Sequence, residues 1–251
     1  MAAECAAGRR LAERDREVEA EGTQLTGTLL LEIARGPALA LSLSILAAGI
    51  AWRLFGIFRL PKRPDFSEPR STALFSGALR GIVSRMWPHR EFGNSPTLAT
   101  SNGYVYHVGL ALVVFGYLPH IAFIERLTGL SWPALPESVF YVAAGLTIVS
   151  LFIALLYRLT DPVLKLLSNF DDYFSWFIVM LALLTGMLVV EQSFKPGAAS
   201  SPNDPLLVAF HLFAVELLFI WLPFGKLSHA FLVFVSRGTT GAAFARKGAR
   251  P

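Results

Sequence analysis

The sequence predicts an all-α integral membrane protein, a bundle of five transmembrane helices with its N-terminus outside and its C-terminus in the cytoplasm. Of the 251 residues, 54% are hydrophobic and only 16% are charged, whereas soluble domains carry about a quarter charged residues. Five apolar runs are each long enough to cross a bilayer, and turn residues or charges separate them. In lipid such runs form helices, because each backbone group must find its hydrogen bond within the segment.

The first span is expected at residues 37–58, after a polar N-terminal segment at residues 1–36. Residues 1–22 carry charges of both signs and no apolar run, so we expect no cleaved secretory signal peptide there. The remaining spans are expected at residues 104–124, 137–157, 173–190 and 206–235. Together the spans make a membrane domain at residues 37–236, and a basic cytoplasmic tail follows at residues 237–251.

The basic residues indicate the orientation. Seven Lys and Arg residues lie in residues 59–102, and others lie in residues 158–172 and in the tail. Because positive loops stay in the cytoplasm, these segments should face it. Within the first of them, residues 73–87 mix apolar side chains with arginines. We expect an amphipathic helix there, either on the anionic inner leaflet or as a docking surface for a cytoplasmic partner.

The overall charge and the cysteine content exclude several classes of protein. The net charge of +4 is explained by cytoplasmic loops, so we expect no nucleic-acid partner. The single cysteine, Cys5, excludes an intrachain disulfide, a covalent haem attachment and a thiolate-held iron–sulfur cluster. Any haem is therefore non-covalent, and any iron–sulfur chemistry lies on another chain.

Four of the five histidines lie in expected spans: His107 and His120 in the second, His211 and His229 in the fifth. On one straight helix, His211 and His229 would share a face and lie about 27 Å apart. Because the second and fifth helices run in opposite directions, His107 matches His229 in depth near the cytoplasm. His120 matches His211 near the outer surface. Each histidine alone would suit a hydrogen bond to a neighbouring helix, but two matched pairs predict two stacked bis-histidine haem sites.

The second pair depends on Pro119. On a straight helix the His120 ring would not share a face with His107, so we expect Pro119 to kink or end the helix and re-aim His120. The fifth histidine, His89, lies in the basic segment and is expected to be solvated or interfacial.

Three further charged residues lie in or near the spans. Glu216 is an intramembrane acid, expected either to transfer protons near a quinone site or to pair with a neighbouring helix. Arg53 and Lys226 lie near the cytoplasmic surface, where they either extend to the headgroups or contact haem propionates.

Two segments carry a family resemblance: SNGYVYHVGLALVVFGY at residues 101–117 and FHLFAVELLFIWLPFGKLSH at residues 210–229. They resemble the gamma, or cytochrome b, subunit of respiratory nitrate reductase. Related membrane cytochromes belong to sulfite-reduction-linked, heterodisulfide-reductase-like and hydrogenase complexes. The resemblance implies five helices, an outer N-terminus and two b haems, with His107 and His229 on the inner haem and His211 on the outer one. It also implies electron exchange between quinone and a cytoplasmic iron–sulfur partner.

The sequence departs from the nitrate reductase pattern at one ligand. In that subunit the second histidine of helix two follows a glycine ten residues after the first, whereas here Tyr117 follows Gly116. Either His120 has taken over the outer haem, or only one haem is bound. This departure favours the heterodisulfide-reductase-like or hydrogenase-linked branch.

The sequence therefore predicts a cytochrome b subunit in the cytoplasmic (inner) membrane, in contact with lipid, quinone, an iron–sulfur subunit and a catalytic subunit. The expected haem-iron ligands are His107, His120, His211 and His229. The alternatives are a proton-conducting transporter and a membrane anchor without a cofactor.

Overall fold

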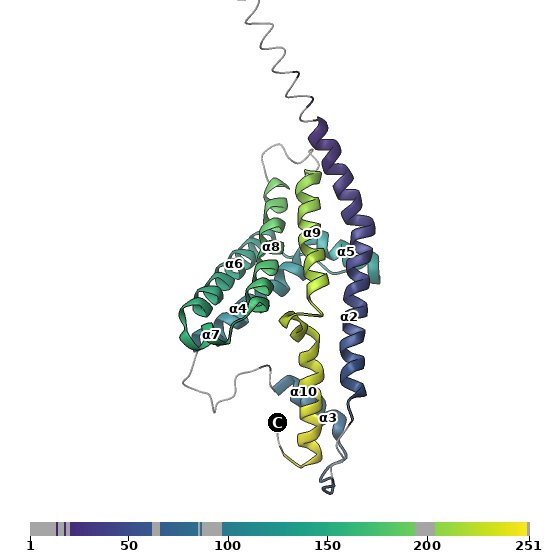
Figure 1. Ribbon diagram of the computed structural model, residues 1–251, viewed down its shortest axis with the longest axis vertical. Helices are drawn as coiled ribbons and strands as arrows, with labels where there is room; N and C mark the ends of the chain where they lie inside the picture. Colours follow the sequence, from purple (N-terminus) through teal and green to yellow (C-terminus); the bar gives the residue numbers. More distant parts are fainter. Residues whose placement is uncertain are drawn as a thin grey trace, which may run out of the picture. The chain divides into compact units, whose positions relative to one another are not determined.

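The computed structural model describes residues 14, 18, 21–61, 66–84, 86, 97–193 and 204–249, and every regular element in these ranges is helical (Figure 1). Four helices are long and apolar enough to cross a membrane: Glu21–Arg59, Leu98–Gly116, Glu137–Thr160 and Phe170–Val190. Pro205–Trp221 and Lys226–Arg246, on either side of a break, would together make a fifth. The regular structure of the described residues is thus all helical, and the several long apolar helices indicate a multi-pass membrane protein.

The helices belong to two compact units, each assembled from distant parts of the sequence. The first unit comprises Met1–Ala51 and Phe177–Pro223, and the second comprises Trp52–Trp176 and Phe224–Pro251. Two helices, α2 (Leu39–Arg59) and α8 (Phe170–Ser193), contribute residues to both units.

In the first unit, a continuously described helix runs from Glu21 into α2 although Pro37 lies inside it. Residues Ala34–Ala38 form a π-helical turn, η1, whose wider ring accommodates a proline that lacks an N–H group. The η1 turn packs against α9 (Pro205–Trp221). Helical structure therefore extends at least 16 residues before the expected span, and part of the polar N-terminal segment is helical.

The prediction of one continuous helix over residues 206–235 is wrong. Helix α9 ends at Trp221, and a 3-10 turn, η4 (Lys226–Ser228), leads into α10 (His229–Arg246). Pro223 and Gly225 explain the break, because proline removes a helical hydrogen bond and glycine weakens a helix. His211 and His229 therefore lie on two different helices and do not share one helix face, contrary to the expectation.

In the second unit, α4 (Thr97–Gly116) packs along α6 (Glu137–Thr160). Gly109 lies so close to Thr147 that an added Cβ would overlap the threonine hydroxyl. Nearby, Ser150 Oγ donates to Asn102 Oδ1 at 2.7 Å, and Asn102 Nδ2 donates to the Ser150 carbonyl at 2.9 Å. These complementary polar groups fix the register of the two helices, since any shift would leave them unpaired.

Helix α6 is apolar on its outer face as well as on its packed face. Its exposed stripe consists of Val142, Leu146, Val149, Ile153 and Leu156, each at least 49% exposed. A soluble helix would carry polar residues there. The exposed apolar stripe therefore suits a helix surrounded by lipid.

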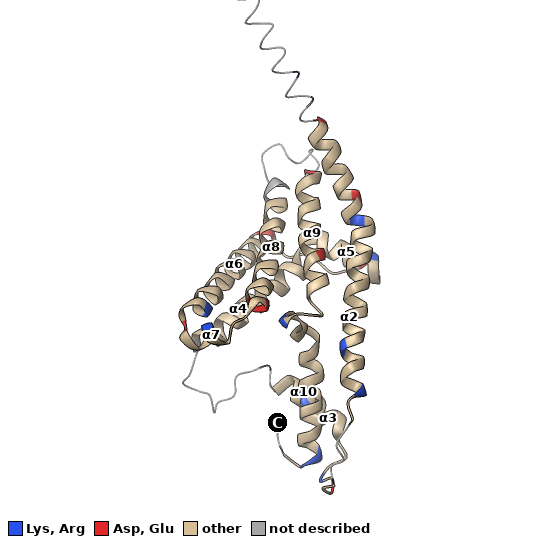
Figure 2. Cartoon of the chain, in the orientation of Figure 1, with Lys and Arg blue, Asp and Glu red and all other residues tan. Residues whose placement is uncertain are grey.

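The amphipathic helix expected at residues 73–87 is present as α3 (Leu74–Ser84), which packs against α10. The two backbones nearly touch, because a Cβ at Gly81 would lie 2.7 Å from Gly241 Cα. Phe75, Leu79 and Val83 are spaced by four residues and are exposed. Both α3 and α10 carry basic residues and no acidic ones (Figure 2).

The expected break at Pro119 is confirmed. Helix α4 ends at Gly116, Tyr117 is extended with φ −88° and ψ 127°, and α5 (Leu118–Thr128) begins with Pro119 in its first turn. The second span therefore starts earlier than residue 104, and its two parts are separate helices.

Candidate functional site

His107 of α4 and His229 at the start of α10 lie together in the second unit. Their ring centroids are 6.0 Å apart, and the ring planes differ by 83°. Both side chains are exposed rather than enclosed by the helices. The pairing of these two residues, expected from their matched depths, is thus a contact in the structure. The turn over residues 226–228, rather than a straight helix, presents His229 to its partner.

The hydrogen bonds of both rings define their tautomers. His107 Nδ1 lies 2.7 Å from the Gly103 carbonyl, and His229 Nδ1 lies 2.8 Å from the Lys226 carbonyl. A carbonyl only accepts, so each Nδ1 carries the proton. In the neutral ring, each Nε2 then keeps its lone pair. A metal-ligating histidine has this arrangement, with its other ring nitrogen bonded to a carbonyl.

The spacing of the rings fits one metal ion between them. An ion bonded to two imidazoles at about 2 Å each would set their ring centroids about 6 Å apart. Each imidazole can rotate about its own metal–nitrogen bond, so an interplanar angle of 83° is compatible. The described residues hold no group of three or more His, Cys, Asp or Glu that would suit a metal ion. Within the described residues, His107 and His229 are therefore the two candidate ligands at this position.

His120 lies at the start of α5, where the Pro119 break directs it back towards α4. Its Nδ1 lies 3.2 Å from the Val113 carbonyl. The ring also meets Tyr117 edge-on, with centroids 5.3 Å apart. His120 is partly buried, in contrast to the exposed His107.

His211 of α9 lies against α8 in the first unit. A Cβ at Gly186 would lie 3.0 Å from the His211 ring, so glycine makes room for it. Thr185 Oγ1 lies 2.7 Å from the Leu181 carbonyl and 3.2 Å from His211 Nδ1. The threonine hydrogen goes to that carbonyl, so Nδ1 is the donor to Oγ1. The pairing of His211 with His120 stays a prediction, because the two residues belong to different units.

Arg53 and Lys226, expected as propionate contacts, both bond to parts of the second unit. The Arg53 guanidinium donates to the Phe224 carbonyl at 2.8 Å. The Lys226 ammonium pairs with Asp172, which also accepts from Arg158 at 2.8 Å. Asp172 was not predicted as a site residue, since no local sequence pattern links it to a lysine 54 residues away.

Glu216 lies in the middle of α9 and is only 5% exposed. Its Oε1 has no hydrogen-bond partner among the described residues. A buried carboxyl oxygen without a partner is costly, and intramembrane acids of this kind serve proton transfer or ligand binding.

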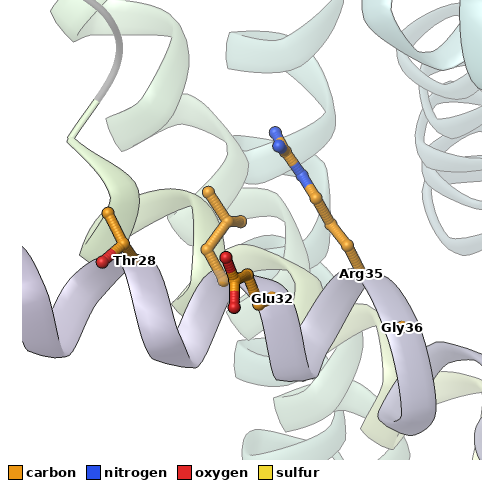
Figure 3. Close-up of a pocket in the computed structure, with 5 residues that line it drawn as sticks. Thr28, Glu32, Arg35 and Gly36 are labelled. Carbon is orange, nitrogen blue, oxygen red and sulfur yellow. The ribbon is translucent and has the colours of Figure 1, made fainter.

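Two other features add no ligand site. A shallow hollow of about 420 Å³ is lined by Thr28, Leu31, Glu32, Arg35 and Gly36. Figure 3 shows that the labelled residues all come from one helix, so the hollow is a groove on its surface. The expected solvated histidine, His89, lies outside the described residues.

Comparison with known proteins finds a distant relative. The chain is 28% identical over 216 residues to a protein of Nitratidesulfovibrio vulgaris strain Hildenborough, covering 84% of this chain and 92% of the relative. The name of that relative, "Protein", states no activity. No family model and no solved structure matches the chain. The resemblance to nitrate reductase gamma subunits therefore rests on residues 101–117 and 210–229 of the chain itself.

Proposed function

We propose that the chain is the membrane cytochrome b subunit of a respiratory oxidoreductase complex. In this proposal it exchanges electrons between the quinone pool and a cytoplasmic iron–sulfur partner, and a further subunit carries the substrate chemistry. The observation that supports it best is the pair His107 and His229, with centroids 6.0 Å apart and both Nδ1 atoms bonded to backbone carbonyls.

The residues have the following roles in this proposal. His107 and His229 hold the inner haem through their Nε2 atoms, and His120 and His211 hold the outer one. A haem held by two of these histidines would supply one-electron transfer rather than substrate binding. Quinone binds near the outer pair, where Glu216 exchanges protons with it.

The proposed orientation keeps the N-terminus outside and the basic helices α3 and α10 at the cytoplasmic surface of the inner membrane. There Arg80, Arg237 and Arg246 give the pair a positive charge that no acidic residue on either helix offsets. This charge suits an acidic partner surface and the anionic leaflet beside it.

An absorption spectrum tests the proposal directly. The purified protein should show reduced b-type haem bands, and two haems per chain by extraction. His107→Ala and His229→Ala should each remove one haem, because the remaining imidazole leaves an axial position unfilled. His89→Ala is the matched control and should leave the count unchanged. A colourless protein would exclude the cytochrome function.

The outer site has its own test. Loss of one haem in both His120→Ala and His211→Ala would support the outer pair, whereas an unchanged count of two in His120→Ala would rule that ligand out. A wild-type count of one would mean that the chain holds the inner haem alone.

A second candidate is a proton-conducting transporter. It is favoured by Glu216 Oε1, a buried atom without a hydrogen-bond partner among the residues that the structure describes. It predicts a colourless protein that acidifies or alkalises the lumen of liposomes. Glu216→Gln should abolish that proton flux.

A further inference from the structure

The turn that carries His229 is held by contacts from two other segments of the second unit. Two residues before the turn, the Phe224 carbonyl accepts from Arg53 at 2.8 Å. At the first residue of the turn, the Lys226 N–H donates to Asp171 Oδ2 at 2.8 Å. The Lys226 ammonium pairs with Asp172. The turn is thus anchored on α2 and on the start of α8.

The two aspartates are themselves fixed. The Asp172 side chain is only 5% exposed and accepts from Arg158 at 2.8 Å and from the Asn169 N–H at 3.0 Å. Asp171 Oδ1 accepts from Ser175 Oγ at 2.9 Å, which leaves Oδ2 directed to the turn. Carboxylates bonded on both oxygens have little rotational freedom, so they serve as rigid anchors.

The anchored residue is also the partner of His229. The Lys226 carbonyl accepts the His229 Nδ1–H at 2.8 Å. Within the turn, the Ser228 N–H donates to the Gly225 carbonyl at 3.1 Å, a short-range bond that does little to fix the direction of the Lys226 carbonyl. The Lys226 carbonyl also accepts the His229 backbone N–H. The Lys226 N–H is held by the Asp171 carboxylate, so Asp171 fixes the residue that carries this carbonyl.

We propose that Asp171 is a positioning residue for the inner haem: by holding Lys226, it keeps a carbonyl on His229 Nδ1 and thereby sets the reduction potential. This inference rests on the proposed function, since it takes His229 as a haem ligand. A hydrogen bond from Nδ1 makes Nε2 more basic, and a more basic ligand stabilises the oxidised iron. Loss of the anchor should raise the midpoint potential.

The test is a redox titration of the purified wild-type protein and three variants, followed by the haem absorption bands. Asp171→Ala removes the acceptor, and Asp171→Asn removes the charge but keeps an oxygen that accepts from Lys226. Asp161→Ala is the matched control, because the Asp161 carboxylate also accepts a backbone N–H, from Leu164 at 2.8 Å, away from the turn. We expect Asp171→Ala to shift the inner-haem reduction equilibrium about tenfold, or about 59 mV upward.

The outcomes separate three explanations. Positioning predicts a shift in Asp171→Ala and a near-wild-type potential in Asp171→Asn and Asp161→Ala. Equal shifts in Asp171→Ala and Asp171→Asn would overturn it, because the lost charge alone would then explain the change. An unshifted Asp171→Ala would overturn it as well.

A replacement variant keeps the inference testable, and two outcomes separate it from the proposed function. If Asp171→Ala does not accumulate in membranes, Asp171→Ser takes its place, because serine suits a helix start yet is too short to reach Lys226. A wild-type protein without haem bands would refute the proposed function and the inference with it. A haem-containing wild type with an unshifted variant would refute the inference alone.

Discussion

The contact between Gly109 and Thr147 predicts an energetic coupling between α4 and α6 that depends on no assumption about function. A methyl group at Gly109 would overlap Thr147 Oγ1, which donates to the Ala143 carbonyl at 2.6 Å. Overpacking of this kind costs about 1–3 kcal/mol, so Gly109→Ala should lower the free energy of unfolding by about 2 kcal/mol. Thr147→Ala should cost less than about 1 kcal/mol, since its hydroxyl bonds to its own helix.

The double variant should cost less than the sum of the single ones. Without the hydroxyl, the new methyl group would face Cβ of residue 147 at 3.1 Å and the Ala143 carbonyl at 3.4 Å. We therefore expect a coupling energy of about 1 kcal/mol or more between the two substitutions.

The assay is unfolding of each purified variant in mixed detergent micelles, followed by far-UV circular dichroism. Gly145→Ala is the control, because it makes the same substitution on α6 where nothing among the described residues lies within 4 Å. It should be neutral or slightly stabilising. Additivity of the two single costs to within about 0.5 kcal/mol would refute the direct contact.

Three further predictions concern the second unit. In a Cys5→Ser background, Ala78→Cys with Gly238→Cys should form a disulfide on oxidation, seen as a gel shift that reductant reverses. The ideal Cβ of residue 238 lies 4.0 Å from that of residue 78, inside the usual range of about 3.5–4.5 Å, so free thiols would contradict the packing of α3 on α10. Asp172→Ala should lower the free energy of unfolding by about 1–3 kcal/mol, because Arg158 and Lys226 both lose their buried counterion. Both cations stay partly exposed, which limits this cost. An unchanged denaturation midpoint would count against the prediction. Gly129 has φ 74°, so Gly129→Ala should cost about 1 kcal/mol, and Gly129→Asn less.

Local chemistry made parts of the structure predictable. Pro119 ended a helix as expected, because the loss of an N–H and the ring clash act within one turn. The same reasoning applied to Pro223 and Gly225 would have predicted the break after Trp221. That signal was present in the sequence, but the long apolar run favoured one straight helix.

Contacts between residues far apart in the sequence were less predictable. The pair of His107 and His229 is an exception, and its depth in the membrane explains why it could be predicted. His107 and His229 were matched by depth alone, a constraint that the bilayer imposes on any antiparallel pair of spans. No such constraint links Asp171 with Lys226 or Asn102 with Ser150, which are separated by 55 and 48 residues. Their side chains meet only because the helices have already packed.

The glycine contact between α3 and α10 has a consequence for biogenesis. Gly241 follows Gly81 by 160 residues, so α3 leaves the ribosome well before its partner is synthesised. Synthesis at about 5–20 residues per second leaves α3 without α10 for roughly 8–32 s. During that interval its glycine face and its apolar stripe are both uncovered. A chaperone or the membrane surface would have to shield them, and a ribosome stalled before α10 would leave α3 open to aggregation or proteolysis.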